Sequence, residues 1–342
     1  MNARRSPQVV AALLVATLGP LGLAGCGSDP LAGSDLPTRR TTAPATPGTG
    51  ATGAGAAGGG PTTGASTTGG APGGGATSAS GGRTLIDATF DGDTPGPVTP
   101  DSFTAAVGPA GHEVAAYDSM TFVREPDGAG TFVRTRLAAD RILGHNDASG
   151  DGNVLVVALE DQSQDSACVS YDVRFSRGFE FSGGGKLPGL LGVAPGVSPG
   201  TPTGGGSTAH GWSGRVMWLG PKVWRIVRES GQPNLGVTYL YHPGQAGTYG
   251  DDLSWGEGFR HATWHSVRQC YRLNKVGEAD GRLQAWLDDE EVLDRSDVVY
   301  RTDPKVHITH LDWSVFRGGD TQDWAAGTDG AVDLDNLRVT VG

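Results

Sequence analysis

The stretch CVSYDVRF at residues 168–175 alternates apolar and polar side chains over its whole length. In an extended strand, successive side chains point to opposite faces, so the apolar residues of this stretch share one face and its polar residues the other. Such a strand is buried on one side only, which is typical of antiparallel sheets. This stretch therefore predicts a β-strand with one core face and decides the fold class.

Ten further segments with this period of two occur after residue 83, separated by clusters of Gly, Pro, Asp and Asn. They cover residues 84–90, 119–124, 131–137, 153–159, 212–218, 237–241, 264–273, 282–287, 308–316 and 332–341. No stretch keeps a helical period with capping residues at its ends. The pattern predicts one all-β domain, a sandwich or a barrel, over residues 84–342.

The N-terminus has the pattern of an export signal. Arg4 and Arg5 precede a broken apolar stretch over residues 9–23, which ends in LAGC at residues 23–26. Apolar-small-small-Cys at this place resembles a bacterial lipobox, in which the Cys26 sulfur carries a diacylglycerol. An ordinary signal peptide with a chance cysteine is the alternative. We expect residues 1–26 to be a lipoprotein signal peptide, and the exported chain to be lipid-anchored to a membrane of the cell envelope.

Residues 27–83 contain 17 Gly among 57 positions, and the remainder are mostly Thr, Ala, Pro and Ser. A segment with so little to bury cannot offset the entropy of its own ordering. We therefore expect a disordered tether between the anchor and the folded domain.

Charge restricts the class of ligand. The 342-residue chain has a net charge of −11 and a pI near 5.1, which argues against a nucleic-acid-binding protein. No Asp or Glu occurs over residues 181–228, a window that contains Lys186, Arg215, Lys222, Arg225 and Arg228. A locally positive region on an acidic protein favours binding of a polyanion, although a Gly-rich loop region that happens to lack acids has the same composition.

Cys168 and Cys270 are the only cysteines after Cys26, and both fall in predicted strands. An exported protein meets an oxidising compartment, so an even pair is a possible disulfide. Two buried free thiols on separate strands are the alternative.

Two of the predicted strands carry candidate functional residues. In residues 212–218, Ser213 and Arg215 share the face opposite to the two tryptophans of that strand, and Tyr239 and Tyr241 share one face of residues 237–241. Taken singly, Arg215 also fits a solvated sheet residue, and the two tyrosines also fit an aromatic ladder.

Several fragments together resemble polysaccharide lyase family 14. They run in order through GGGKLPGL at 183–190, GWSGRVMW at 211–218, YLYHP at 239–243, YGDD at 249–252, WH at 264–265, DGRLQAWLD at 280–288 and DLDNLRV at 333–339. Two departures stand out: residues 193–208 match poorly, and Gly214 stands where alanine is expected.

This resemblance implies a jelly-roll β-sandwich of two antiparallel sheets with a concave substrate groove, which cleaves alginate or glucuronic-acid polymers by β-elimination. It places the functional lysine of the family at Lys186, its Ser-x-Arg pair at Ser213 and Arg215, and its Tyr-x-Tyr pair at Tyr239 and Tyr241. We expect a monomer that acts on an acidic polysaccharide, with no cofactor and no metal.

The chemistry agrees with these residue types. Removing the C5 proton of a uronate puts a second charge beside its carboxylate, which Lys186 and Arg215 would neutralise. Tyr239 and Tyr241 would share the acid and base work, or Lys186 would be the base. Ser213 would orient the substrate, and His210, at a loop edge near Ser213, could reach a sugar. A non-catalytic carbohydrate-binding sandwich and a purely structural envelope protein are the alternative functions.

Overall fold

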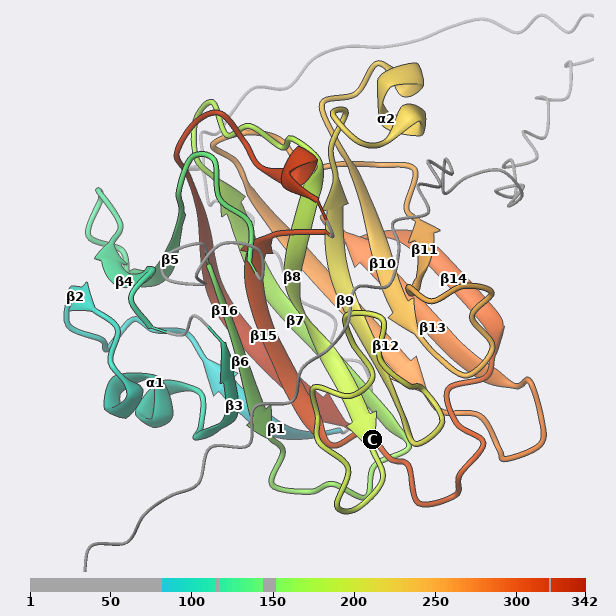
Figure 1. The fold of residues 1–342 in the computed structure, drawn as a ribbon. Coiled ribbons are helices and arrows are strands. Elements are labelled where there is room, and N and C mark those ends of the chain that lie inside the picture. The colour runs from blue at the N-terminus through green and yellow to red at the C-terminus, as the bar shows by residue number, and fades with distance from the viewer. Residues whose placement is uncertain (1–81, 115–116, 144–151, 320) are drawn as a thin grey trace, which may run out of the picture. The chain divides into compact units, whose positions relative to one another are not determined.

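The computed structural model describes residues 82–114, 117–143, 152–319 and 321–342. The predicted signal peptide, Cys26 and almost all of the predicted tether lie outside these residues. Two antiparallel sheets pack face to face, and Figure 1 shows the sheet that contains residues 184–193 and 211–219 in front of the sheet that contains residues 166–175 and 264–272. The predicted β-sandwich of two antiparallel sheets is thus confirmed.

Sheet A has the strand order β14-β13-β12-β7-β16-β5-β4-β2, and β1 also pairs with β16. Its strands are β1 (Arg83–Ala88), β2 (Gly96–Pro97), β4 (Met120–Arg124), β5 (Thr131–Leu137), β7 (Ser166–Phe175), β12 (Trp264–Arg272), β13 (Gly281–Leu287), β14 (Glu290–Val298) and β16 (Gly330–Val341). Sheet B has the order β11-β10-β9-β8-β15-β6-β3. Its strands are β3 (Ala110–Val114), β6 (Asn153–Ala158), β8 (Gly184–Val193), β9 (Gly211–Leu219), β10 (Leu235–Tyr241), β11 (Asp251–Ser254) and β15 (His310–Arg317).

Helices are few and short among these residues. They are α1 (Pro100–Ala106), α2 (Arg225–Ser230) and the 3₁₀ turn η1 (Gln322–Trp324). Thr99 caps α1, because its side chain accepts a hydrogen bond from the Ser102 backbone N–H. Within the described part of the chain, no helix is long and apolar enough to cross a membrane.

All eleven segments with a period of two contain a strand. The structure adds five strands that the pattern did not predict: β2, β3, β8, β11 and β14. The most consequential of these is β8, the central strand that carries the GGKLPGL motif. Its glycines and Pro188 are typical of a turn, yet β8 pairs with β9 on one side and with β15 on the other.

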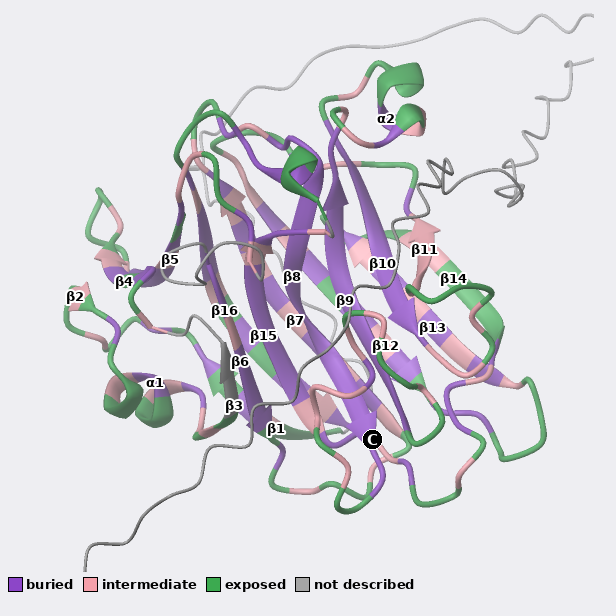
Figure 2. Ribbon diagram, in the orientation of Figure 1, coloured by how far each residue is buried: buried purple, intermediate pink, exposed green. Residues whose placement is uncertain are grey.

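The main core fills the space between the two sheets and contains three fully buried tryptophans, Trp212, Trp218 and Trp313. In β7 and β12, buried and partly exposed residues alternate, as expected for a sheet with one wet face. In β8, β9 and β10, by contrast, every residue is buried, and Figure 2 shows this as a continuous band across sheet B. The middle of sheet B therefore exposes little side-chain surface on either face.

Cys168 and Cys270 lie directly opposite each other on β7 and β12, and a disulfide joins them. The register of two neighbouring antiparallel strands brings their Cα atoms to 4.0 Å. Of the two alternatives that the sequence left open, the structure shows the disulfide, although the two cysteines are 102 residues apart in the sequence.

Gly214 is explained by the ring that packs on it. A Cβ at this position would lie 2.5 Å from Cε1 of Tyr271, whose hydroxyl lies 2.9 Å from the Gly214 carbonyl oxygen. Tyr271 is itself buried in the core between the sheets, so its ring has little room to retreat. The Tyr271 ring thus occupies the space that the methyl group of the expected alanine would need.

We expect Gly214→Ala to lower the free energy of unfolding by about 1–3 kcal/mol, because the added methyl overpacks the contact with Tyr271. Denaturant unfolding followed by tryptophan fluorescence measures this loss. Gly92→Ala is the control, since a Cβ at Gly92 would meet nothing within 4 Å. Equal stability of the two variants would contradict the packing explanation.

Candidate active site

Five strands of sheet B bring polar residues into one row on the face away from the core. On β10, Tyr239 lies opposite Arg215 of β9 and opposite Asp252 of β11. Arg215 lies opposite Gly189 of β8, which in turn lies opposite Asp312 of β15. The row therefore places one phenol, one guanidinium and two carboxylates side by side.

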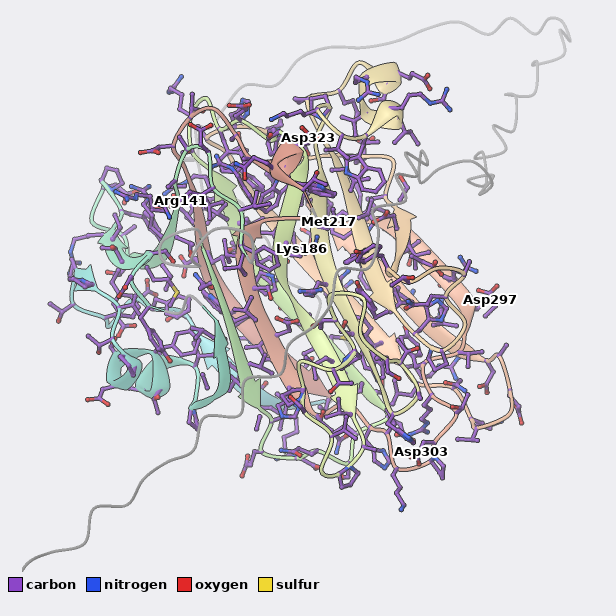
Figure 3. All side chains as sticks on the ribbon, viewed as in Figure 1. Arg141, Lys186, Met217, Asp297, Asp303 and Asp323 are labelled. Atoms are coloured by element: carbon purple, nitrogen blue, oxygen red, sulfur yellow. A yellow bond between two sulfur atoms is a disulfide. The ribbon has the colours of Figure 1, made fainter. Side chains whose placement is uncertain are left out.

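Lys186 lies on β8 beside this row, opposite Met217 of β9, and Figure 3 shows the two side chains in the middle of sheet B. Its ammonium donates a hydrogen bond of 2.9 Å to the Gly318 carbonyl oxygen. The same nitrogen lies 4.9 Å from the ring centroid of Tyr239 and 5.2 Å from that of Trp324. These distances are in the cation–π range, so aromatic faces and a carbonyl hold the buried ammonium.

Arg215 approaches the ring of Tyr239 as well, with Cζ 6.0 Å from its centroid. Its Nε lies 3.6 Å from Oδ2 of Asp312, which is an ion pair but too long for a hydrogen bond. Among the residues that the structure describes, this buried Nε has no hydrogen-bond partner. Lys186 and Arg215 thus both contact Tyr239, and Arg215 keeps an unused donor.

The two tyrosines of β10 form a hydrogen-bonded pair. Their hydroxyl oxygens lie 3.2 Å apart, and their rings meet edge to face. The backbone N–H of Gly205 donates to the Tyr241 hydroxyl oxygen over 2.9 Å. Since Tyr241 accepts that bond, its own O–H can donate to Tyr239. This arrangement leaves the Tyr239 proton available for another acceptor.

Burial raises the pKa of Tyr239 well above its ordinary value, and the neighbouring Tyr241 adds to this effect, whereas the charge of Arg215 lowers the pKa. Tyr239 is therefore protonated in the resting site at neutral pH. A protonated phenol can give a proton but cannot take one, so the resting Tyr239 has the chemistry of an acid and not of a base.

Asp252 was not among the candidates from the sequence, which noted it only within the YGDD fragment. Burial raises the pKa of Asp252 to about 7, and the charge of Lys186 opposes the rise. Its Oδ1 is shut off from solvent and has no hydrogen-bond partner in the described part of the chain. The short strand β11 follows a hairpin after β10, and only the register between the two strands places this carboxylate beside Tyr239.

The raised pKa of Asp252 predicts that the difference in stability between the wild-type chain and Asp252→Asn depends on pH. The folded chain binds this proton more tightly than the unfolded chain, whose carboxyl has the ordinary pKa of 3.8. Stability from this group is thus complete below pH 3.8 and is lost as the pH rises to about 7. We expect the wild-type chain to lose stability relative to Asp252→Asn over this window, with no further change above it. Denaturant unfolding of both chains at a series of pH values measures the difference, and parallel curves would contradict it.

Ser213 and His210 are placed differently from the other candidates. On β9, Ser213 lies opposite Tyr241 of β10, but it is fully buried. Its hydroxyl donates to the Pro202 carbonyl oxygen over 2.6 Å. Ser213 thus fastens the β8–β9 connection over the end of β10. His210 is exposed, and its Nδ1 lies 3.2 Å from Oδ2 of Asp303, which Figure 3 places far from Lys186. The structure does not bring His210 to the row around Tyr239.

Residues 181–228, the window without Asp or Glu, contribute only Lys186 and Arg215 of their five cations to this site. Lys222 donates to the Ala325 carbonyl oxygen, and Arg225 pairs with Glu229 on α2. Arg228 donates to backbone carbonyls just before that helix. The acids that face Lys186 and Arg215 come instead from β11 and β15, which lie outside the window. The site is therefore mixed in charge rather than purely positive.

Comparisons with known proteins agree with this architecture. The family model of polysaccharide lyase 14 matches residues 140–337. No curated protein matches the chain. Similar solved structures include the alginate lyase Aly36B, which is 22% identical with a TM-score of 0.60, the match covering 74% of this chain and 95% of that one.

Two further alginate lyases share the fold. The polysaccharide lyase 14 enzyme of Aplysia kurodai is 21% identical with a TM-score of 0.62, and the match covers 76% of this chain and 100% of that one. The Chlorella virus enzyme vAL-1 is 15% identical with a TM-score of 0.56, over 73% of this chain and 99% of that one. At these identities the structures show a common fold, whereas the family model spans more than half of the sequence. The chain therefore belongs to polysaccharide lyase family 14.

Proposed function

We propose that this lyase cleaves a polyuronate by β-elimination at the row around Tyr239. The observation that carries the proposal is the position of the Tyr239 ring, which both Lys186 and Arg215 contact and whose hydroxyl is hydrogen-bonded to that of Tyr241. The alginate lyases that share the fold act on a polymer of this class.

The reaction needs one cation, one base and one acid. The C5 proton of a uronate lies next to the C6 carboxylate, so its removal creates a second negative charge on the same group. Arg215, whose Nε lies 3.6 Å from Asp312 without a hydrogen bond, stabilises that charge as it develops. The C5–H electron pair then forms the C4=C5 double bond, and the C4–O4 bond breaks. O4 leaves with its electron pair and takes up a proton.

Tyr239 is the group best placed to supply that proton, because it is protonated at rest. The tyrosinate that forms is stabilised by the O–H of Tyr241 and by the two cations on its ring. Lys186 is the remaining titratable cation beside Tyr239, and in its neutral form it takes the C5 proton. This assigns the base role to Lys186 and the acid role to Tyr239.

Ultraviolet absorbance tests the activity. The full chain is incubated with alginate and with polyglucuronate, and the C4=C5 double bond of each product is followed by absorbance and by product mass. A rise with at least one polymer is expected. Saturable binding without any product would overturn the lyase assignment and favour the non-catalytic carbohydrate-binding sandwich.

We also propose that the chain is exported and held at a membrane by a lipid on Cys26, and that it acts as a monomer. The support is the LAGC pattern after an apolar stretch with two leading arginines. Cys26→Ser is expected to move the protein from the membrane fraction to the soluble fraction of its host. Retention in the membrane fraction would contradict the anchor, and light scattering of detergent-solubilised chains measures the oligomeric state.

A further inference from the structure

Sheet A carries a hollow on its outer face, the face that points away from the core. We call it the outer groove. It has a volume of about 310 Å³, and it is lined by residues of β1, β7, β12, β13 and β16, among them Asp172, Arg268, Trp286 and Arg338. Its residues alternate along the strands with core residues such as Val169 and Val173, so the outer groove and the core lie on opposite faces of one sheet.

A single cross-strand row forms the middle of the outer groove. Asp87 of β1 lies opposite Arg338 of β16, which lies opposite Ser170 of β7. Ser170 lies opposite Arg268 of β12, and Arg268 lies opposite Trp286 of β13. The small side chain of Ser170 is thus flanked on both sides by long ones, which leaves room for a ligand between them.

The arginines on the two sides of Ser170 differ in their partners. Arg338 is neutralised, because its guanidinium forms hydrogen bonds with both carboxylate oxygens of Asp87. Arg268 lies over the Trp286 ring, with Cζ 3.9 Å from the ring centroid, and it has no carboxylate within ion-pair distance in the described part of the chain. A guanidinium over an indole ring can still form a bidentate bond to a carboxylate through its N–H groups.

The rest of the outer groove offers acceptors for hydroxyl groups. Asp172 accepts one hydrogen bond of 2.8 Å from the Asn336 side chain, which leaves further lone pairs of its carboxylate open. Ser170 and Ser266 line the hollow beside it and can donate or accept. A ligand that satisfies this surface carries a carboxylate for Arg268 and several hydroxyls for Asp172 and the serines. A uronic-acid sugar has this combination of groups.

The platform under these side chains is rigid. The disulfide Cys168–Cys270 joins β7 and β12 at positions two residues from Ser170 and Arg268, and therefore on the same face. Preorganised side chains lose less entropy when a ligand binds. The covalent link thus holds the Ser170–Arg268 pair at a fixed spacing in the free protein.

We infer that the outer groove is a second, non-catalytic site for a uronate chain, on the opposite side of the sandwich from the row around Tyr239. The choice of a uronate as its ligand rests on the proposed function. The described residues that line the outer groove include no lysine, and the ring of Tyr171 packs in the core instead, so we expect the site to bind without cleaving. It would keep a long polymer attached while another part of the polymer is cut.

Calorimetric titration of the full chain with uronate tetrasaccharides tests this inference. Every chain in this experiment also carries Lys186→Ala, so that the ligand is not cleaved during the measurement. We expect two binding events per chain. Arg268→Ala should weaken one of them about ten- to hundred-fold, the usual cost of losing a charged hydrogen-bonding partner. Arg272→Ala is the matched control, because Arg272 is an exposed arginine on the same strand and face but outside the outer groove.

The outcomes separate the two proposals. One binding event that Arg268→Ala abolishes supports the outer groove and contradicts binding at the catalytic row. Binding that Arg268→Ala leaves unchanged, or that Arg272→Ala weakens equally, overturns the inference. So does equal binding of a neutral glucose tetrasaccharide, because Arg268 would then recognise no carboxylate. Near-ultraviolet circular dichroism of each variant verifies that the sandwich remains folded.

Discussion

Lys186→Arg is expected to lower kcat on a polyuronate by about 10²–10⁴-fold, the usual contribution of a general base. An arginine keeps the positive charge beside Tyr239 but cannot lose its proton at any accessible pH. The substitution therefore separates the two roles open to Lys186, that of a base and that of a fixed cation. Initial rates of double-bond formation at saturating polymer measure the loss.

Lys222→Arg is the control for this experiment. Lys222 also donates to a backbone carbonyl oxygen, that of Ala325, but none of its described contacts is with Tyr239. Its replacement by arginine should leave kcat near the wild-type value. If Lys186→Arg retained activity within about ten-fold of wild type, Lys186 would act through its charge alone, and another group would have to remove the C5 proton.

Tyr239→Phe is expected to cause a loss of similar size, about 10²–10⁴-fold in kcat, because the leaving oxygen then receives no proton from the enzyme. The ring and its contacts with both cations would remain, so substrate affinity should change little. Tyr241→Phe should cost less, since that hydroxyl acts on the substrate only through its hydrogen bond to Tyr239.

A substrate with a better leaving group distinguishes an acid from a structural tyrosine. When O4 of the uronate carries a nitrophenyl group, the phenolate departs without needing a proton. Tyr239→Phe should then approach the wild-type rate, while Lys186→Arg should stay slow because the C5 proton must still be removed. An equal defect of Tyr239→Phe on both substrates would show that Tyr239 does not protonate the leaving oxygen.

The strands with a period of two were predictable because each has one face in the core, as in CVSYDVRF of β7. The strand β8 was not, because its sequence signals turns. Its glycines are required by close approach: a Cβ on Gly189 would overlap the Gly214 carbonyl oxygen and lie 2.7 Å from the Cα of Arg215. The register between β8 and β9 shifts at this point, between Leu187 and Gly189. Close backbone contact of this kind depends on the neighbouring strand, which a local pattern does not contain.

The family resemblance gave Lys186, Arg215, Tyr239 and Tyr241, which the structure brings together. It also gave Ser213, whose hydroxyl donates instead to the Pro202 carbonyl oxygen. Composition alone indicated a locally positive region that favours a polyanion, but it did not show that Asp252 and Asp312 lie in the same row as Arg215. Asp312 comes from a strand nearly a hundred residues after Arg215 in the chain, and only the β8–β15 pairing brings the two together. Counting charges along a window cannot detect neighbours that tertiary pairing supplies.

The disulfide between Cys168 and Cys270 closes a loop of about one hundred residues, and every residue of the row around Tyr239 except Asp312 lies inside this loop. In a chain-entropy model, a cross-link of this length removes so many conformations from the unfolded chain that it favours the native state by about 4–5 kcal/mol. Oxidation thus favours the folded arrangement of the strands that carry the row around Tyr239. A chain kept in a reducing environment would have the same residues, but a larger share of its molecules would hold them too far apart to act together.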